Sequence, residues 1–141
     1  MNEIISLVGE VEILLNNVVV VQKKNLIVQV GKNFLANAVL SNSTSPFVAI
    51  AVGSGTTAAS SGNTILESEL YRGVYTTSNI LNNVITLTLI MLPGIATGSI
   101  SEAGIFNNAT SGGTMLSRIV FSTISKQSID TLTLTWTITV G

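Results

Sequence analysis

The segment TLTLTWTITV at residues 131–140 decides the fold class of this 141-residue chain. Threonine occupies every odd position from 131 to 139, and every even position is apolar, so the pattern has a strict period of two. Because successive side chains of a β-strand point to opposite faces, the segment predicts a strand with an apolar face against a core. The threonine face is then expected to meet solvent or polar neighbours. Trp136 lies in the apolar register and is expected in the core.

Two Asn-Asn pairs predict hairpin turns upstream of this strand. Asn16-Asn17 and Asn82-Asn83 each lie between aliphatic, β-branched segments. Asparagine tolerates the positive φ that a tight two-residue turn requires. Strands are predicted over residues 10–15, 18–22, 26–30, 47–52, 71–76 with a possible extension to 81, 84–92, 99–106, 115–124 and 131–140.

One short helix is predicted from near Gly31 over residues 32–40, where Phe34, Leu35, Ala38 and Val39 form a helical face. Residues 53–64 are small, polar and glycine-rich, which predicts a flexible surface loop. After it, Thr64 and Glu67 have capping-box spacing, so we expect one helical turn over 65–70.

These elements predict an all-β protein, an antiparallel β-sandwich or jelly-roll-like barrel of about eight strands with one short helix. The length suits a single β-domain over residues 1–141. Its N-terminal hairpin or arm, residues 1–24, is available for contact with another subunit.

The composition excludes several kinds of site. The chain has no His and no Cys, so the usual zinc sites, thiol nucleophiles and Ser-His-Asp triads cannot be built. Six basic and seven acidic residues amount to 9% of the chain and cannot neutralise a run of phosphates, so no nucleic-acid partner is expected. We expect no catalytic, cofactor-binding or metal-binding residues, and no enzyme activity.

The N-terminus lacks the positive segment and long apolar stretch of a signal peptide. No segment approaches about 18 uninterrupted apolar residues, so neither a membrane-spanning helix nor a membrane partner is expected.

A few charged residues stand out by position. Glu102 and Arg118 lie in otherwise uncharged predicted strands, while Glu69 and Arg72 lie close together in the sequence. A catalytic or ligand-binding pair is one interpretation, and structural ion pairs that set strand register are the favoured one. Glu10 and Glu12 share one strand face and could serve as a glycosidase-like pair or hold a cation. A solvated hairpin face is favoured, because no third ligand and no perturbing environment is visible.

The loop at 53–62 lacks the lysine and the following helix of a phosphate-binding loop, so phosphate binding is disfavoured. Polar side chains in this loop and in the loop at 107–113 are candidates for binding a ligand: Ser54, Thr56, Asn108 and Thr110.

The order and spacing of several short motifs resemble a module common among tailed-bacteriophage structural proteins. They are KNLIV at 24–28, GKN at 31–33, IAVGSGTTA at 50–58, LESELYR at 66–72, EAGIFN at 102–107, SGGTMLSR at 111–118 and the closing residues 126–140. The resemblance covers most of the chain and extends to predicted tail-fibre, head-fibre and capsid-associated proteins. It implies a non-enzymatic virion component, assembled in the host cytoplasm.

A free-standing module without a heptad stalk favours a capsid decoration, or cement, protein that acts as a homotrimer and binds the major capsid protein or other virion proteins. A tail, collar or baseplate fibre subunit, or an adhesin that binds a host surface glycan, is the alternative. The apolar N-terminal hairpin is the expected contact between subunits. Its interface candidates are Ile4, Ile5, Leu7, Val8, Val18, Val19, Val20 and Val21.

Overall fold

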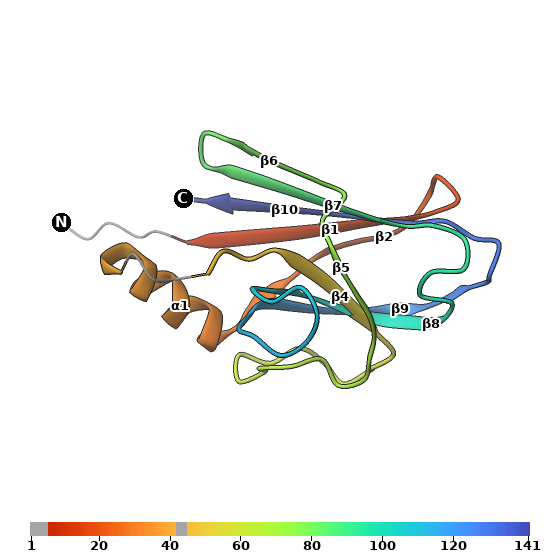
Figure 1. Ribbon diagram of the computed structural model, residues 1–141, viewed down its shortest axis with the longest axis horizontal. Coiled ribbons are helices and arrows are strands. Elements are labelled where there is room, and N and C mark those ends of the chain that lie inside the picture. The colour runs from red at the N-terminus through yellow and green to blue at the C-terminus, as the bar shows by residue number, and fades with distance from the viewer. Residues whose placement is uncertain (1–5, 42–44) are drawn as a thin grey trace.

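Two five-stranded antiparallel sheets face each other in the computed structural model, which describes residues 6–41 and 45–141 (Figure 1). In spatial order, sheet A contains β2 (Val18–Lys24), β1 (Leu7–Leu15), β10 (Leu132–Val140), β7 (Val84–Met91) and β6 (Thr77–Leu81). Sheet B contains β3 (Leu26–Ile27), β9 (Met115–Lys126), β8 (Gly98–Phe106), β4 (Ala49–Gly53) and β5 (Glu69–Val74). One helix, α1 (Gln29–Leu40), lies at the end of the sandwich where β10 ends (Figure 1).

The prediction of an all-β, antiparallel, sandwich-like fold with one short helix is therefore confirmed. The sandwich alternative holds rather than the closed barrel, because each sheet keeps two edge strands of its own. The described residues contain ten strands where the sequence predicted about eight. The predicted ranges number nine, and the tenth strand comes from the division of the predicted 71–81 segment into two. The predicted 26–30 strand is present only as Leu26–Ile27, because α1 already begins at Gln29.

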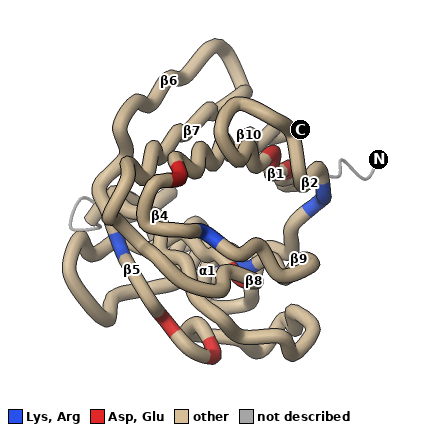
Figure 2. Tube along the Cα trace, turned by 90° about the vertical axis from the view of Figure 1, so that its right-hand side faces the viewer, with Lys and Arg blue, Asp and Glu red and all other residues tan. Residues whose placement is uncertain are grey.

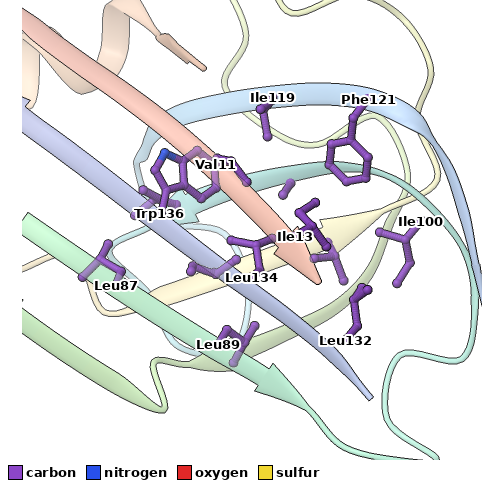
Figure 3. Close-up of a cluster of buried hydrophobic side chains, with 14 of the residues drawn as sticks. Val11, Ile13, Leu87, Leu89, Ile100, Ile119, Phe121, Leu132, Leu134 and Trp136 are labelled. Atoms are coloured by element: carbon purple, nitrogen blue, oxygen red, sulfur yellow. The ribbon is translucent and has the colours of Figure 1, made fainter. Parts of the chain in front are cut away.

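Side chains along β10 alternate between the core and the outer face of sheet A, as the period-two pattern predicts. Leu132, Leu134, Trp136 and Ile138 are buried in the core, and the threonines between them are half-buried on the outer face of sheet A. Trp136 is fully buried and lies among side chains from both sheets, including Val11 of β1 and Ile119 of β9 (Figure 3).

Both predicted hairpin turns are present. Asn16 and Asn17, with φ of 50° and 66°, join β1 to β2, and Asn82, with φ of 55°, lies in the turn between β6 and β7. Positive φ at these positions matches the turn type that the Asn-Asn pairs predict.

The possible extension of the 71–76 strand to residue 81 is wrong, because the chain changes sheets at Tyr75 and Thr76. The backbone N–H of Tyr75 donates to the carbonyl of Val48 in the chain that leads into β4, at 3.4 Å. The next N–H, that of Thr76, donates to the carbonyl of Thr88 in sheet A, at 2.7 Å. Both halves keep extended geometry, so the sequence pattern does not show the crossing.

The predicted helical turn over 65–70 is also wrong. The segment before β5 is irregular, because the N–H groups of Glu67 and Ser68 donate to the carboxylate of Glu102 rather than to helical carbonyls. Leu66 is buried beneath this segment, in a small apolar cluster that includes Phe106 and Met115.

That small cluster covers the face of sheet B that points away from sheet A. Sheet B is consequently covered on both faces, and all five residues of β4 are buried, as the apolar run at 47–52 predicts. The cover comes from the loops at 54–68 and 107–114, which lie on the side of sheet B away from sheet A (Figure 1).

Helix α1 starts at Gln29, earlier than predicted, and only part of its predicted apolar face is covered. Leu35 packs against the core, and the ring of Phe34 meets that of Phe47 edge-on at 4.8 Å. Ala38 and Val39 are exposed, because the helix continues beyond the sheets. Gly31 is required at the point of contact, since a Cβ there would lie 2.5 Å from the Leu116 carbonyl oxygen.

Candidate functional site

The structure brings Glu102 of β8 and Arg118 of β9 together as a buried ion pair on the outer face of sheet B. The Arg118 Nη2 atom lies 2.9 Å from Glu102 Oε2, and the two side chains are 2% and 0% exposed. Glu102 is opposite Val120 and Arg118 opposite Gly104 in the β8–β9 ladder, so the pair is a diagonal contact between neighbouring strands. A buried charge is costly unless it is paired, and here each charge neutralises the other.

Glu102 also accepts three backbone hydrogen bonds from the loop at 54–68. Gly55 and Ser68 donate to Oε1 at 3.0 and 2.7 Å, and Glu67 donates to Oε2 at 3.0 Å. Both ends of a long irregular segment are thus attached to one carboxylate. Gly55 must be a glycine, because a Cβ there would lie 2.6 Å from the Glu102 carboxylate.

The middle of this loop is attached to Arg118 through Asn63. The Arg118 Nη1 atom donates to Asn63 Oδ1 at 3.1 Å, and the same oxygen accepts the N–H of Ser60 at 2.8 Å. The Ser101 hydroxyl donates to the Gly55 carbonyl at 2.8 Å. The loop that the sequence predicts to be flexible is therefore tied to sheet B at several points.

Glu67 closes the loop from its exposed side. Its carboxylate accepts the N–H groups of Thr56 and Thr57 and the hydroxyl of Thr57. The Thr57 hydroxyl, followed by the two backbone N–H groups, lowers the pKa of Glu67 below its ordinary value. Glu67 is thus a clamp between residues 56–57 and the start of β5, not the helix cap that its spacing with Thr64 predicts.

Arg72 of β5 forms the second ion pair and holds the loop at 107–114. Its guanidinium makes two hydrogen bonds to Glu69, at 2.8 and 3.2 Å, and lies 3.9 Å from the centroid of the Phe106 ring. Its Nη1 atom donates to the carbonyls of Asn108 and Gly112, at 3.1 and 2.8 Å. The Arg72 side chain is only 4% exposed, whereas that of Glu69 is 33% exposed, so the guanidinium is held by protein groups while its carboxylate partner still meets water.

The four loop candidates are all exposed, on loops whose backbones are held in place. Asn108 Oδ1 accepts from the N–H groups of Thr110 and Ser111 and from the Thr110 hydroxyl, so it orders its own loop. The backbone N–H groups of Ser54 and Thr56 are bonded to Ser68 and Glu67, which leaves their side chains at the surface.

A second polar cluster, which the sequence did not predict, lies at the end of the sandwich opposite α1 (Figure 1). Lys126 is buried and donates to the carbonyls of Leu92 and Asp130, at 3.2 and 2.7 Å. Burial lowers the pKa of Lys126 from its ordinary value. Asp130 accepts from Asn16 and from the N–H of Gln127, and these bonds lower the pKa of Asp130. The cluster joins the β1–β2 turn to the β9–β10 turn.

The predicted interface residues that the structure describes divide into two groups. Ile4 and Ile5 lie outside the described residues. Leu7 and Val21 are partly buried against the core of their own chain, because they point inward from sheet A. The exposed apolar members of the hairpin are Val8, Val18, Val19 and Val20.

Sheet A carries exposed aliphatic side chains at both of its edges. Val18 is 64% exposed at the β2 edge, and Ile80 is 73% exposed at the β6 edge. The sequence does not single out the β6 edge, because residues 77–81 are expected only as a possible extension of the 71–76 strand. Between the edges, the outer face consists largely of threonine from β7 and β10.

Glu10 and Glu12 lie on that outer face, where Glu12 accepts a hydrogen bond from Gln22 at 3.1 Å. The described part of the chain holds no cluster of three metal-ligating side chains.

Charged residues are sparse along the whole trace (Figure 2). No helix within residues 6–41 and 45–141 has the length and apolarity needed to cross a membrane.

Comparisons with protein-family models, with curated proteins and with solved structures find no match to the chain. What the structure defines is a β-sandwich with two internally braced loops on one sheet and two apolar edges on the other.

Proposed function

We propose that the chain is a non-enzymatic structural subunit of a tailed-bacteriophage particle, which associates with copies of itself and decorates the capsid shell. The observation that carries this proposal is the exposure of aliphatic side chains along both edge strands of sheet A. Unpaired strand edges with apolar side chains favour pairing with another chain, and soluble monomers normally protect such edges with charge or proline. The motif order described above supports the phage origin.

The two edges differ, which supports a closed ring. An interface between β2 of one copy and β6 of the next is head-to-tail, and such contacts close into a ring when the rotation allows it. Three copies at a threefold position of a capsid are the arrangement we propose. The major capsid protein is then the partner beneath the ring.

The bracing of sheet B fits a subunit that must keep its shape. The buried pair of Glu102 and Arg118 holds the loop at 54–68, and Arg72 holds the loop at 107–114. The Glu102 carboxylate and the two guanidinium groups make their hydrogen bonds within the chain, which supports a structural role for them over a catalytic one.

The experiment is a comparison of oligomeric state between the purified protein and two matched variants. Val19→Lys places a charge on the β2 edge, and Thr135→Lys places the same charge at the centre of the sheet A outer face. We expect sedimentation to show a trimer, whose dissociation constant rises at least about tenfold in Val19→Lys. Thr135→Lys should remain within about twofold of the parent protein. A monomeric parent, or a larger effect of Thr135→Lys, contradicts the proposed edge contact.

Position in the particle is tested separately by counting copies. Mass spectrometry of purified particles should give hundreds of copies relative to the major capsid protein, spread over the shell in electron micrographs. A few copies confined to the tail would replace decoration with a tail, collar or baseplate role.

A second candidate, an adhesin for a host surface glycan, is favoured by the ordered loops that display Ser54, Thr56, Asn108 and Thr110. Loops held in a fixed conformation lose less entropy on binding. Purified protein should then bind host cells, and Thr56→Ala with Thr110→Ala should abolish binding without changing the oligomeric state. Intact oligomer that does not bind cells contradicts this function.

A further inference from the structure

Two of the three exposed basic residues of the chain line one pocket. The chain has six basic residues, and the side chains of three of them are buried. The exposed ones are Lys23, Lys24 and Lys32. Lys23 and Lys24 line a pocket of about 430 Å³, whereas Lys32 lies outside its lining. Most of the exposed positive charge therefore lies at this pocket.

The pocket lies between three segments that are far apart in the sequence. The end of β2 and the start of β3, residues 23–26, form one wall. Residues 56 and 58–59 of the loop at 54–68 form the second wall, and residues 118–120 of β9 form the third. The loop wall is held by the contacts with Glu102 and Arg118 described above, so the pocket is present before any ligand binds.

The ammonium group of Lys23 is held at the pocket wall by a carbonyl of the other sheet. Lys23 Nζ donates to the Val120 carbonyl at 2.6 Å, and this bond connects β2 of sheet A to β9 of sheet B. An ammonium group has three N–H bonds, and this contact uses one of them. No second acceptor among residues 6–41 and 45–141 bonds to Lys23, so its other N–H bonds are available to a ligand. Because the side chain is already anchored, binding costs it less entropy.

No acidic residue belongs to the described lining of the pocket. Lys24 lies opposite Glu10 in the β1–β2 register, but the two form no ion pair in the part of the chain that the structure describes. The third cation of the lining, Arg118, is already balanced by Glu102. Two ammonium groups without a counter-charge in the pocket favour a ligand that carries negative charge.

The donors of the pocket favour a carboxylate over a phosphate. Phosphate sites usually add backbone N–H groups or a free guanidinium to their lysines. Here the Arg118 guanidinium is bound to Glu102, and the N–H groups of Gly55 and Thr56 are bonded to carboxylates. The remaining donors, two ammonium groups, are sufficient for one singly charged group.

The rest of the wall restricts the body of the ligand. Leu26, Ala58 and Ala59 provide apolar contact, and Thr56 adds an exposed hydroxyl at the rim. Sites of about 300–1,000 Å³ with apolar walls and a few polar groups are typical for small molecules. The pocket therefore has the size and the polarity for a ring with hydroxyl groups and one carboxylate.

From the two lysines, the apolar wall and the Thr56 hydroxyl, we propose that this pocket binds a sugar acid of monosaccharide size. The carboxylate contacts the ammonium groups of Lys23 and Lys24, and a ring hydroxyl contacts Thr56. The proposal rests on the second candidate function, the adhesin, and names the class of glycan that it binds.

The test compares D-galacturonate with D-galactose by calorimetry and NMR at pH 7. The two sugars differ in one carboxylate, which is ionised at this pH. We expect saturable binding of about one galacturonate per chain, with shifted signals from Ala58 and Ala59. Galactose should bind at least about tenfold more weakly, because it lacks the charge-assisted hydrogen bonds. Equal affinities, or no saturable binding of galacturonate, overturn the proposal. Acetate that binds as tightly as galacturonate shows an anion site without sugar recognition and also overturns it.

Lys24→Met tests the ammonium group that has no partner within the described residues. The unfolding temperature should stay unchanged, while the affinity for galacturonate falls about threefold, as expected for one exposed charge pair. Lys32→Met removes the same charge outside the lining and should keep the parent affinity. Equal losses in the two variants would show that net charge alone attracts the sugar acid, which contradicts a defined site.

Binding to host cells separates this site from the adhesin function itself. Protein that binds cells but not galacturonate overturns the pocket assignment and leaves the adhesin function in place. Protein that binds galacturonate but not cells supports the pocket and contradicts the adhesin function. When both bind, Lys24→Met should weaken cell binding and Lys32→Met should not, and unchanged cell binding by Lys24→Met overturns the pocket as the glycan site.

Discussion

Replacement of Glu102 by glutamine should destabilise the protein far more than any change to an exposed charge. The substitution keeps the size of the side chain but removes the charge that balances Arg118, and it replaces one acceptor oxygen with a donor. Glu102 is 0% exposed, and its two oxygens accept three backbone N–H groups and the Arg118 guanidinium. Breaking a buried ion pair from one side typically costs about 3–5 kcal/mol, because the other charge stays buried and unpaired.

For a chain of this length, that loss corresponds to a decrease of roughly 10–15 °C in the unfolding temperature. Urea unfolding can be followed through Trp136, the single tryptophan, which is fully buried. Glu10→Gln removes an exposed carboxylate from sheet A and should change the free energy of unfolding by less than about 0.5 kcal/mol.

The double variant Glu102→Gln with Arg118→Met separates pairing from packing. It should lose less stability than the sum of the two single variants, by about 1–3 kcal/mol, since neither charge is left alone. Hydrogen exchange should also show faster exchange of the Gly55 and Ser68 amides in Glu102→Gln. A loss below about 1 kcal/mol in Glu102→Gln, or strict additivity in the double variant, would refute this account of the pair.

The remaining predictions concern the loops, the core and acid stability. Arg72→Lys cannot make the forked contact with a carboxylate and two carbonyls, so urea unfolding should show a loss of about 1–3 kcal/mol; an unchanged midpoint would contradict the bracing role. Leu134→Ala, in the core, should cost about 2–5 kcal/mol, whereas the exposed Ile129→Ala should stay within about 0.5 kcal/mol, and similar losses in both would contradict the assigned core. The pKa of Glu67 is lowered in the folded protein, so its stabilising effect is present above its ordinary value of 4.5 and is lost as the pH falls through the folded pKa. Urea midpoints measured from about pH 2 to 5 should therefore fall less steeply in Glu67→Gln than in the parent, and parallel curves would show that Glu67 is not a clamp.

Local patterns were sufficient to predict most of the secondary structure. Period-two alternation gave the location of β10 and the burial of Trp136, and the Asn-Asn pairs gave both hairpin turns. The helix was found with an error of a few residues at its start. These features depend on contacts within a strand or a turn, where sequence spacing and spatial spacing are linked directly.

The errors arose where a distant residue competed with a local preference. The capping-box spacing of Thr64 and Glu67 is a genuine local signal, yet Glu102 takes the N–H groups that a helical turn would use. Glu102 is 35 residues from Glu67 in the chain, so no window around Glu67 contains the competitor. Similarly, extended residues at 71–81 are compatible with one strand or two, and only the pairing of Tyr75 with sheet B and Thr76 with sheet A distinguishes them.

The sequence by itself determined that this protein is all-β and antiparallel, a sandwich or a barrel with little charge, because alternation and turn chemistry are properties of neighbouring residues. It also singled out four charged side chains as structural pairs, since so few charges occur in its strands. Only the tertiary structure decided how they are used. Glu102 with Arg118, and Arg72 with Glu69, each hold a loop against sheet B through groups that lie far away in sequence. The exposed edges of sheet A were likewise set by strand order, which results from long-range pairing and has no local signature.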